Sequence, residues 1–274
     1  MRNALKFTSI LATAGVALSL AACGSSGSSS SDANAPLKVV ASPTPHGQIL
    51  KYVKDNLAEK AGLKLDIKEV TDYVTPNTAV QDGSADANFF QHVPYLEDFN
   101  KKHGTNIVSV EPVHLEPLGV YSKKVKAITD LPDGATIGLP NDATNEGRAL
   151  KLLADNKLIT LKDGVTTAAT PADVTGNPKN FKWKELEAAQ LPRSVADLDA
   201  AVINGNYAID SGLKPATDAL VLEKADGNPY ANILAVKKGK ENDPRVKKLA
   251  ELLHSDEVKK YIDDTFQGSV IPAF

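Results

Sequence analysis

Three side chains that could contact a ligand together, Phe90, His92 and Tyr95, lie close to one another in the chain. A β-prone stretch at residues 85–90 passes here into a helical pattern, and α/β proteins place ligand sites where strands end and helices begin. Aromatic rings with one polar imidazole suit a thioether, because sulfur gains about 0.3–1.5 kcal/mol beside a ring edge. The alternative places Phe90 in the core and His92 in a turn, and spacing alone leaves both open.

Arg148 is the second candidate. After residue 22 the chain has only three arginines, Arg148, Arg193 and Arg245, although it is rich in lysine. Arginine is preferred where a planar, two-pronged donor must hold a carboxylate. Arg148 falls early in a helix expected over residues 144–156 with Thr144 as its N-cap, where free backbone N–H groups also favour an anion. A surface position on this helix is the alternative.

Two asparagines could complete a polar site. Asn204 ends a helix expected over residues 194–204, directly before Gly205, and Asn232 starts a strand expected over residues 231–236. An amide can accept a hydrogen bond from an ammonium group and donate one to a carboxylate. A purely structural role is the alternative for each.

The sequence gives less support to a metal site or an enzyme active site than to a ligand-binding site. There is no Gly-x-Ser-x-Gly nucleophile elbow, although Asp72 or Asp86 could form an acid–base set with His92 in a hydrolase or isomerase. We expect no catalytic residue, no metal and no cofactor. The remaining histidines are scattered without metal-ligand spacing: His46, His103, His114 and His254.

Strand-like and helical patterns alternate along residues 37–274, which indicates an α/β fold with mainly parallel sheets. Extended, proline-containing stretches at residues 112–119 and 227–232 are candidate crossings between two lobes. The first lobe would then combine residues 37–116 with 231–274, and residues 117–230 would form an inserted second lobe. Further helices are expected at residues 46–61, 93–103, 243–254 and 256–266.

The N-terminus indicates export and lipid anchoring. The apolar run at residues 7–22 follows Arg2 and Lys6, and it is shorter than the roughly 20 residues of a spanning helix. Leu20-Ala-Ala-Cys23 resembles a bacterial lipobox, so residues 1–22 are expected to be a lipoprotein signal peptide and Cys23 the lipid anchor. Residues 23–36 would be a flexible Gly/Ser tether. The alternative is a buried cysteine after a chance apolar run.

Charge and cysteine content exclude other classes. The net charge of −3 becomes −5 without residues 1–22, which contain two basic residues and no acidic one. With no basic cluster, nucleic acid is not an expected partner. Cys23 is the sole cysteine, so the fold must be stabilised by packing without disulfides.

Several motifs along residues 37–274 resemble the methionine-binding lipoproteins of the NlpA family. They occur in order along the chain: Asp72-Tyr-Val-Thr-Pro-Asn77, Asp86-Ala-Asn-Phe-Phe-Gln-His-Val-Pro-Tyr-Leu96, Gly119-Val-Tyr-Ser-Lys-Lys124, Pro140-Asn-Asp-Ala-Thr-Asn-Glu-Gly-Arg148, Leu186-Glu-Ala-Ala-Gln-Leu-Pro-Arg193, Ala201-Val-Ile-Asn204 and Pro229-Tyr-Ala-Asn232.

The resemblance implies a two-lobed periplasmic-binding-protein fold (type II-like), with two inter-lobe crossings and the ligand in the cleft. It implies that Arg148 pairs with the ligand's α-carboxylate, and that Asn204 and Asn232 bind the amino-acid head group. The side-chain pocket around the thioether would be lined by Tyr73, Phe90, His92 and Tyr95.

The same resemblance implies a function without catalysis. The protein would capture methionine outside the cytoplasm and deliver it to the permease and ATPase of an ABC importer, as a monomer that contacts the cell membrane through its lipid anchor only. The alternatives are a methionine-containing dipeptide or another small amino acid as ligand, and an extracytoplasmic hydrolase.

Overall fold

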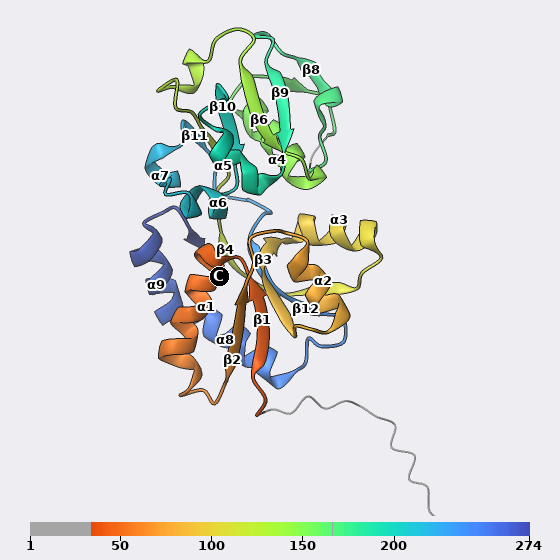
Figure 1. The fold of residues 1–274 in the computed structure, drawn as a ribbon, viewed down its shortest axis with the longest axis vertical. Coiled ribbons are helices and arrows are strands. Elements are labelled where there is room, and N and C mark those ends of the chain that lie inside the picture. The colour runs from red at the N-terminus through yellow and green to blue at the C-terminus, as the bar shows by residue number, and fades with distance from the viewer. Residues whose placement is uncertain (1–33, 166) are drawn as a thin grey trace, which may run out of the picture. The chain divides into compact units, whose positions relative to one another are not determined.

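Two mixed β-sheets organise the computed structural model, which describes residues 34–165 and 167–274 (Figure 1). The expected signal peptide, Cys23 and most of the expected tether lie outside these residues. The first sheet has the strand order β13-β4-β12-β3-β1-β2. Its strands are β1 (Leu37–Ala41), β2 (Leu65–Glu69), β3 (Ala87–His92), β4 (Ile107–Leu115), β12 (Asn232–Lys237) and β13 (Ile271–Pro272).

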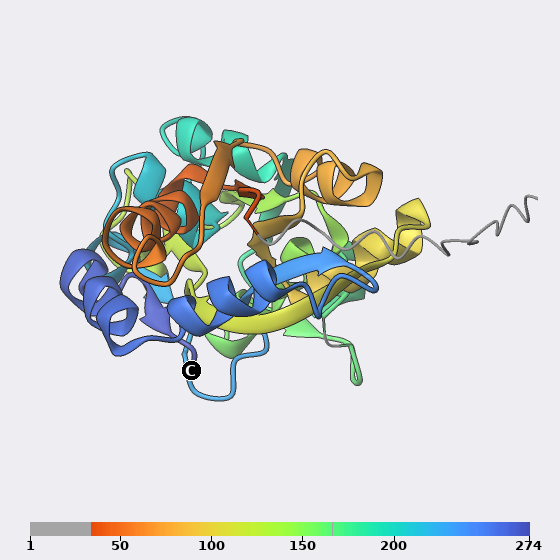
Figure 2. The ribbon, with the colours of Figure 1, turned by 90° about the horizontal axis from the view of Figure 1, so that it is seen from below.

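Helices cover both faces of the first sheet (Figures 1 and 2). One face carries α1 (Gln48–Val53), flanked by π-helical turns at Pro43–Gly47 and Lys54–Ala58, together with α8 (Pro244–Leu253) and α9 (Asp256–Phe266). The other face carries α2 (Thr75–Asp82) and α3 (Val93–His103).

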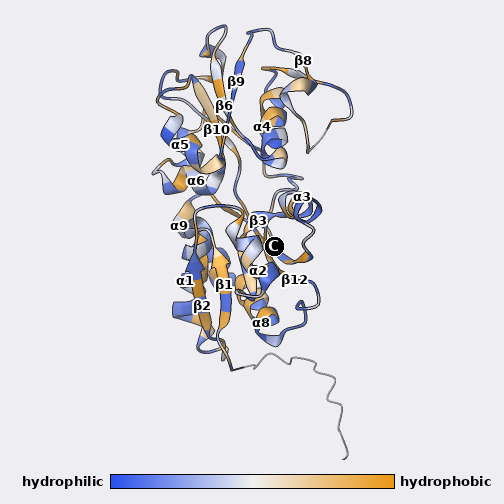
Figure 3. Ribbon diagram, turned by 45° about the vertical axis from the view of Figure 1, so that its right-hand side comes forward, coloured by the Kyte–Doolittle hydropathy of each residue, from blue (hydrophilic) through white to orange (hydrophobic). Residues whose placement is uncertain are grey.

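Strand β12 shows why this sheet is apolar on both sides. Leu234 and Val236 pack into the core shared with α1, α8 and α9, whereas Ile233 and Ala235 pack into the core beneath α2 and α3. Successive side chains of a strand point to opposite faces, so a central strand between two helical layers is apolar throughout. Figure 3 shows the same for β1, which is mostly hydrophobic.

The second sheet has five strands in the order β11-β5-β10-β6-β9. They are β5 (Gly119–Tyr121), β6 (Thr136–Pro140), β9 (Lys182–Leu186), β10 (Ala200–Ile203) and β11 (Val221–Leu222), and β7 (Thr160–Leu161) pairs separately with β8 (Val174–Gly176). The helices of this region are α4 (Ala143–Asp155), α5 (Leu191–Ser194), α6 (Gly205–Asp210) and α7 (Pro215–Asp218), with 3-10 turns at Ile128–Asp130, Pro171–Asp173 and Ala188–Gln190.

The expectation of mainly parallel sheets is wrong. In the first sheet β1 runs parallel to β2 and β3, but β12 is antiparallel to both β3 and β4. The reason is that β12 re-enters the first sheet from the opposite direction, after the chain has passed through the second sheet. This return sets Asn232 opposite His92 on one side and opposite His114 on the other.

The helix expected over residues 194–204 is also wrong. Helix α5 ends at Ser194, and Ala200–Ile203 forms β10, which lies between β5 and β6 with all four residues buried. A short, continuous apolar run fits a buried strand as well as a helix face, and pairing on both sides decides for the strand. Gly205 therefore begins α6 and does not end a helix.

Other expectations are confirmed or need small corrections. Helix α3 has the expected bounds, with Gly104 in the left-handed conformation after it. Asp142, not Thr144, caps α4, because the Asp142 carboxylate accepts a hydrogen bond from the Asn145 backbone N–H at 3.0 Å. Strand β4 continues to Leu115, into the stretch 112–119 that was expected to be a crossing between lobes.

Candidate functional site

A pocket lies where the ends of β3, β4 and β12 meet the starts of α4 and α6. Its lining atoms surround about 330 Å³ of space outside the protein atoms, open solvent included. All seven ligand-binding residues expected from the sequence line it: Tyr73, Phe90, His92, Tyr95, Arg148, Asn204 and Asn232.

Aromatic rings form one wall of this pocket. Phe90 is buried at the end of β3, and the centroid of its ring lies 5.8 Å from that of Tyr73 and 6.0 Å from that of Tyr95. Tyr207 adds a further ring 5.0 Å from Tyr73. The Tyr95 hydroxyl donates to the Tyr73 backbone oxygen at 3.0 Å, which holds the wall together. Such a surface favours an apolar or sulfur-containing side chain.

His92 occupies the junction between β3 and α3. Its Nδ1 accepts a hydrogen bond from the Tyr95 backbone N–H at 3.1 Å, so Nε2 carries the proton and donates to Asn145 Oδ1 at 3.2 Å. Burial, reinforced by the charge of Arg148, lowers the pKa of His92 to about 3. His92 is therefore neutral at physiological pH. Its Nδ1 caps the start of α3, and its Nε2 bonds to α4.

Arg148 is buried, with 4% of its surface exposed. Its Nε and Nη2 donate to the Glu223 carboxylate at 3.0 and 2.5 Å, and Nη2 also donates to the Glu116 backbone oxygen at 3.0 Å. The guanidinium lies 4.2 Å from the centre of the Tyr230 ring. Among the described residues no hydrogen bond reaches Nη1, which leaves that nitrogen as the donor for a ligand.

Glu223 thus accepts hydrogen bonds from Nε and Nη2 of Arg148. A ligand carboxylate was expected to bind this two-pronged edge of the guanidinium. Burial disfavours ionisation of Glu223, but the charge and hydrogen bonds of Arg148 outweigh burial and lower its pKa. The pair is an internal ion pair that holds the guanidinium in one orientation.

The two expected asparagines present different atoms. Asn204 is the N-cap residue of α6, and its Nδ2 donates to Asn145 Oδ1 at 2.9 Å. Its Oδ1 is buried and has no partner among the described residues. Asn232 Oδ1 lies 3.1 Å from His46 Nε2, so its amide NH₂ is the group left to donate to a ligand.

Sequence reasoning missed five further lining residues, which are Gln91, Glu116, Asn145, Gly205 and Asn206. A signal existed for Asn145, which precedes Arg148 by three residues and therefore shares its helix face. Asn206 accepts a hydrogen bond from the Tyr73 hydroxyl at 2.6 Å. This contact joins segments that are far apart in the chain, so no local sequence pattern predicts it.

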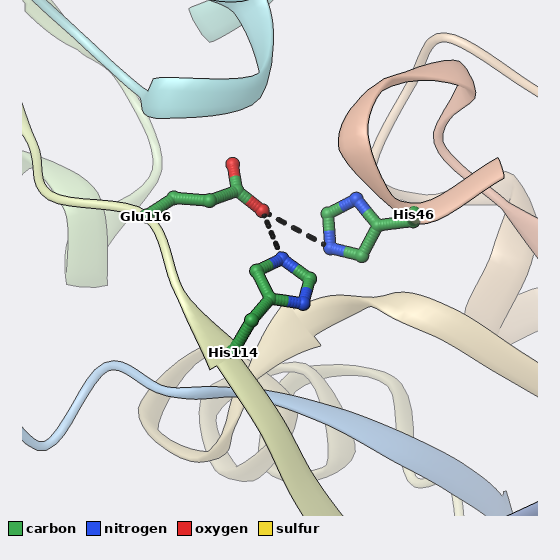
Figure 4. Close-up of side chains that lie close together, drawn as sticks. All are labelled: His46, His114 and Glu116. Carbon is green, nitrogen blue, oxygen red and sulfur yellow. Dashed lines mark hydrogen bonds and ion pairs between the residues drawn. The ribbon is translucent and has the colours of Figure 1, made fainter. Parts of the chain in front are cut away.

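The expectation that the histidines are scattered is wrong for two of them. The ring centroids of His46 and His114 lie 4.7 Å apart, and both Nε2 atoms point at Glu116 Oε1 (Figure 4). The three side chains are buried and offer ligand atoms within 4.8 Å of one another, so they could approach a metal ion.

Comparison with known proteins agrees with the fold. Residues 37–274 match the family model described as NlpA lipoprotein. The chain is 43% identical over 267 residues to the methionine-binding lipoprotein MetQ of Bacillus subtilis (strain 168), covering 96% of each chain.

Two solved structures are similar along their whole length. A nutrient binding protein from Burkholderia cenocepacia bound to methionine has a TM-score of 0.84 and 45% identity, covering 87% of this chain and 100% of that one. A periplasmic substrate-binding protein of an ABC transporter from Coxiella burnetii has a TM-score of 0.83 and 45% identity, covering 86% and 100%.

The fold is that of a two-lobed, type II-like periplasmic substrate-binding protein. More specifically, the chain belongs to the NlpA lipoprotein family. Within the described residues, none of the helices combines the length and apolar character needed to cross a membrane.

Proposed function

We propose that this protein captures methionine as a zwitterion in the pocket and delivers it to an ABC importer. One observation carries the proposal: a buried guanidinium with a spare donor, Arg148 Nη1, shares a pocket with a wall of aromatic rings. The names of the relatives, one methionine-binding and one bound to methionine, support the same ligand.

The ligand would bind with its two ends in different surroundings. The α-carboxylate accepts hydrogen bonds from Arg148 Nη1 and from the amide of Asn232, while Asn204 Oδ1 accepts one from the ammonium group. The thioether then contacts Phe90 and Tyr95, whose ring edges favour polarizable sulfur.

We propose lobe bounds of 37–116 with 231–274 and of 117–230, which sheet membership supports because β1–β4, β12 and β13 share one sheet. Two of the hydrogen bonds that then join the lobes lie at the aromatic end of the pocket. The Tyr207 hydroxyl donates to the Thr71 backbone oxygen at 2.7 Å, and the Tyr73 hydroxyl donates to Asn206 at 2.6 Å. These contacts close the aromatic end of the pocket, and closure strengthens charge pairing by excluding water.

The partners and location follow from the same proposal. Cys23 would carry the lipid that holds the protein at the outer face of the cell membrane, and the closed form would be presented to the permease and its ATPase. The protein acts as a monomer without catalysis. In support, Asp72 bonds to the backbone N–H groups of Val74 and Thr75, and Asp86 to the backbone N–H of Lys38, so neither is bonded to His92.

The deciding experiment is mass spectrometry of small molecules released from gently purified protein, followed by thermal melts with methionine added. We expect intact methionine, and a ligand at a hundred times its Kd should stabilise the protein by about 2.7 kcal/mol. Release of a dipeptide or of a different amino acid would identify that molecule as the substrate in place of methionine. Turnover of methionine, or no shift in Tm, would refute the proposal.

A further inference from the structure

Glu116, between β4 and β5, is held by two histidines behind the pocket (Figure 4). His114 Nε2 lies 2.7 Å from Glu116 Oε1, and His46 Nε2 lies 3.2 Å from the same oxygen. Glu116 also lines the pocket, where its carboxylate lies beside Gly205 at the start of α6. Two imidazoles therefore orient a carboxylate toward the ligand.

Both histidines are neutral donors. The Nε2 atoms face only acceptors, Glu116 Oε1 and, for His46, Asn232 Oδ1, so each Nε2 carries its hydrogen. Burial lowers the pKa of His46 to about 4 and that of His114 to about 3. Neither contributes a positive charge at neutral pH. His114 donates a hydrogen bond to Glu116, whereas His46 donates to Asn232 and lies 3.2 Å from the same Glu116 oxygen.

The ionisable side chains counted around the pocket carry a net negative charge. Arg148 contributes one positive charge, Glu223 cancels it in the ion pair, and the Glu116 carboxylate adds one negative charge. Asp210 adds further negative potential, and burial raises the pKa of Glu116. A buried, uncompensated carboxylate costs free energy, so this pocket favours a cationic group.

Lone-pair counting shows that Glu116 has room for a donor. A carboxylate offers about four acceptor sites. The hydrogen bond from His114 uses one and a backbone hydrogen bond from Asn206 uses a second, while His46 Nε2 lies 3.2 Å from Oε1. Asn204 Oδ1, buried and without a partner among the described residues, lines the same pocket.

We propose that Glu116 is the counter-ion of the ligand's α-ammonium group, with His46 and His114 as positioning residues and Asn204 Oδ1 as the second acceptor. This inference rests on the proposed capture of an amino acid and specifies how its free amine is recognised. It follows that an otherwise identical ligand without the amine is rejected.

A metal ion is the competing occupant of the same cluster, but the geometry favours hydrogen bonds. Tetrahedral zinc with bonds of about 2.0–2.1 Å places its ligand atoms about 3.3 Å apart, whereas His114 Nε2 and Glu116 Oε1 are 2.7 Å apart. Metal-binding histidines donate their other ring nitrogen to an acceptor, and no hydrogen bond of ordinary geometry reaches Nδ1 of His46 or His114 from the described residues.

The test compares methionine with its des-amino analogue, methylthiobutanoate, by titration calorimetry on the wild-type protein and on Glu116→Gln. We expect wild type to bind methionine at least a hundredfold more tightly than the analogue. Glu116→Gln should weaken methionine by a similar factor and leave the analogue unchanged. Glu111→Gln, which changes an exposed acid on the preceding strand β4, is the matched control and should behave as wild type.

Each of the following outcomes would overturn the inference. Similar affinity of wild type for both ligands would show that the amine is not recognised, and this measurement does not depend on a variant that folds. Equal losses for both ligands in Glu116→Gln would assign Glu116 a structural role. Loss of methionine binding after EDTA dialysis, restored by Zn²⁺, would assign the cluster to a metal. Wild type that binds no methionine would instead refute the proposed function itself.

Discussion

Glu223 holds Arg148 by its Nε and Nη2 edge, so the guanidinium reaches the pocket through Nη1 alone. The pair lies between the pocket and a second hollow on the far side of Tyr230. A buried ion pair of this kind contributes little net stability but costs much when one partner is removed. Arg148 neutralises a buried acid, and under the proposed function it would also donate to the ligand.

Arg148→Ala should reduce methionine affinity by roughly 2–5 kcal/mol, because the ligand carboxylate would be buried without its donor. The Tm should fall as well, since Glu223 loses its partner. Calorimetry and thermal melts measure both effects. Arg193→Ala, at an exposed arginine, is the control, and near wild-type affinity of Arg148→Ala would remove Arg148 from the site.

Phe90→Ala should weaken methionine binding by about tenfold or more, because the thioether loses its ring-edge contacts. Alanine, whose side chain ends before this wall, should lose much less if it binds. Titrations with both amino acids test this, with the partly exposed Phe274 changed to alanine as a control. Equal losses for both ligands would make Phe90 a structural residue only.

Folding stability should fall as the pH drops from about 6.5 towards 4. The pKa values of His46, His92 and His114 are lowered to about 4, 3 and 3 by burial, so the unfolded chain binds protons that the folded chain does not. Each histidine contributes a slope of about 1.4 kcal/mol per pH unit in this window. Chemical denaturation at pH 7.5 and 5.5 measures the slope.

The exposed His103 provides the control for this slope, because His103→Gln should leave it unchanged. Stability that is flat or increases between pH 7.5 and 5.5 would contradict the burial of three neutral imidazoles.

Tyr207→Phe should accelerate methionine release by about two- to tenfold, since it removes one hydrogen bond worth about 0.5–1.5 kcal/mol. The lost bond is the one from the Tyr207 hydroxyl to Thr71. Stopped-flow release rates test the effect. Tyr121→Phe removes a buried hydroxyl that has no hydrogen-bond partner among the described residues and should not alter release.

Local patterns predicted the elements that carry the aromatic wall. The passage from β3 into α3 was readable because Pro94 fits a first helical turn and Gly104 the turn after the helix. Strand β10 was misassigned because a short buried apolar run has no distinguishing period. Asn204 nevertheless lies in the pocket, since the end of a strand and the start of α6 coincide there.

The cluster of Glu116 with His46 and His114 was not predictable from local sequence. His46 and His114 are brought together only by the packing of the turn at Pro43–Gly47 against β4, and Glu116 becomes significant only beside them. Asn206 likewise depends on Tyr73 from a distant segment. Contacts between segments far apart in the chain leave no periodic signal. The sequence therefore showed Arg148 as a candidate to bind a carboxylate, but it did not show Glu116 as a candidate to bind an amine.

The pairing of Asn232 with both His92 and His114 limits how the returning chain can vary in length. A strand displaced by a single residue turns every side chain to the other face, so one insertion or deletion within β12 would remove the amide from the pocket and bring an aliphatic side chain in. Changes in length should be tolerated instead at residues 224–228, where the chain is exposed. Engineering this protein to bind another substrate should therefore begin with point substitutions in the aromatic wall of the pocket and leave β12 unchanged.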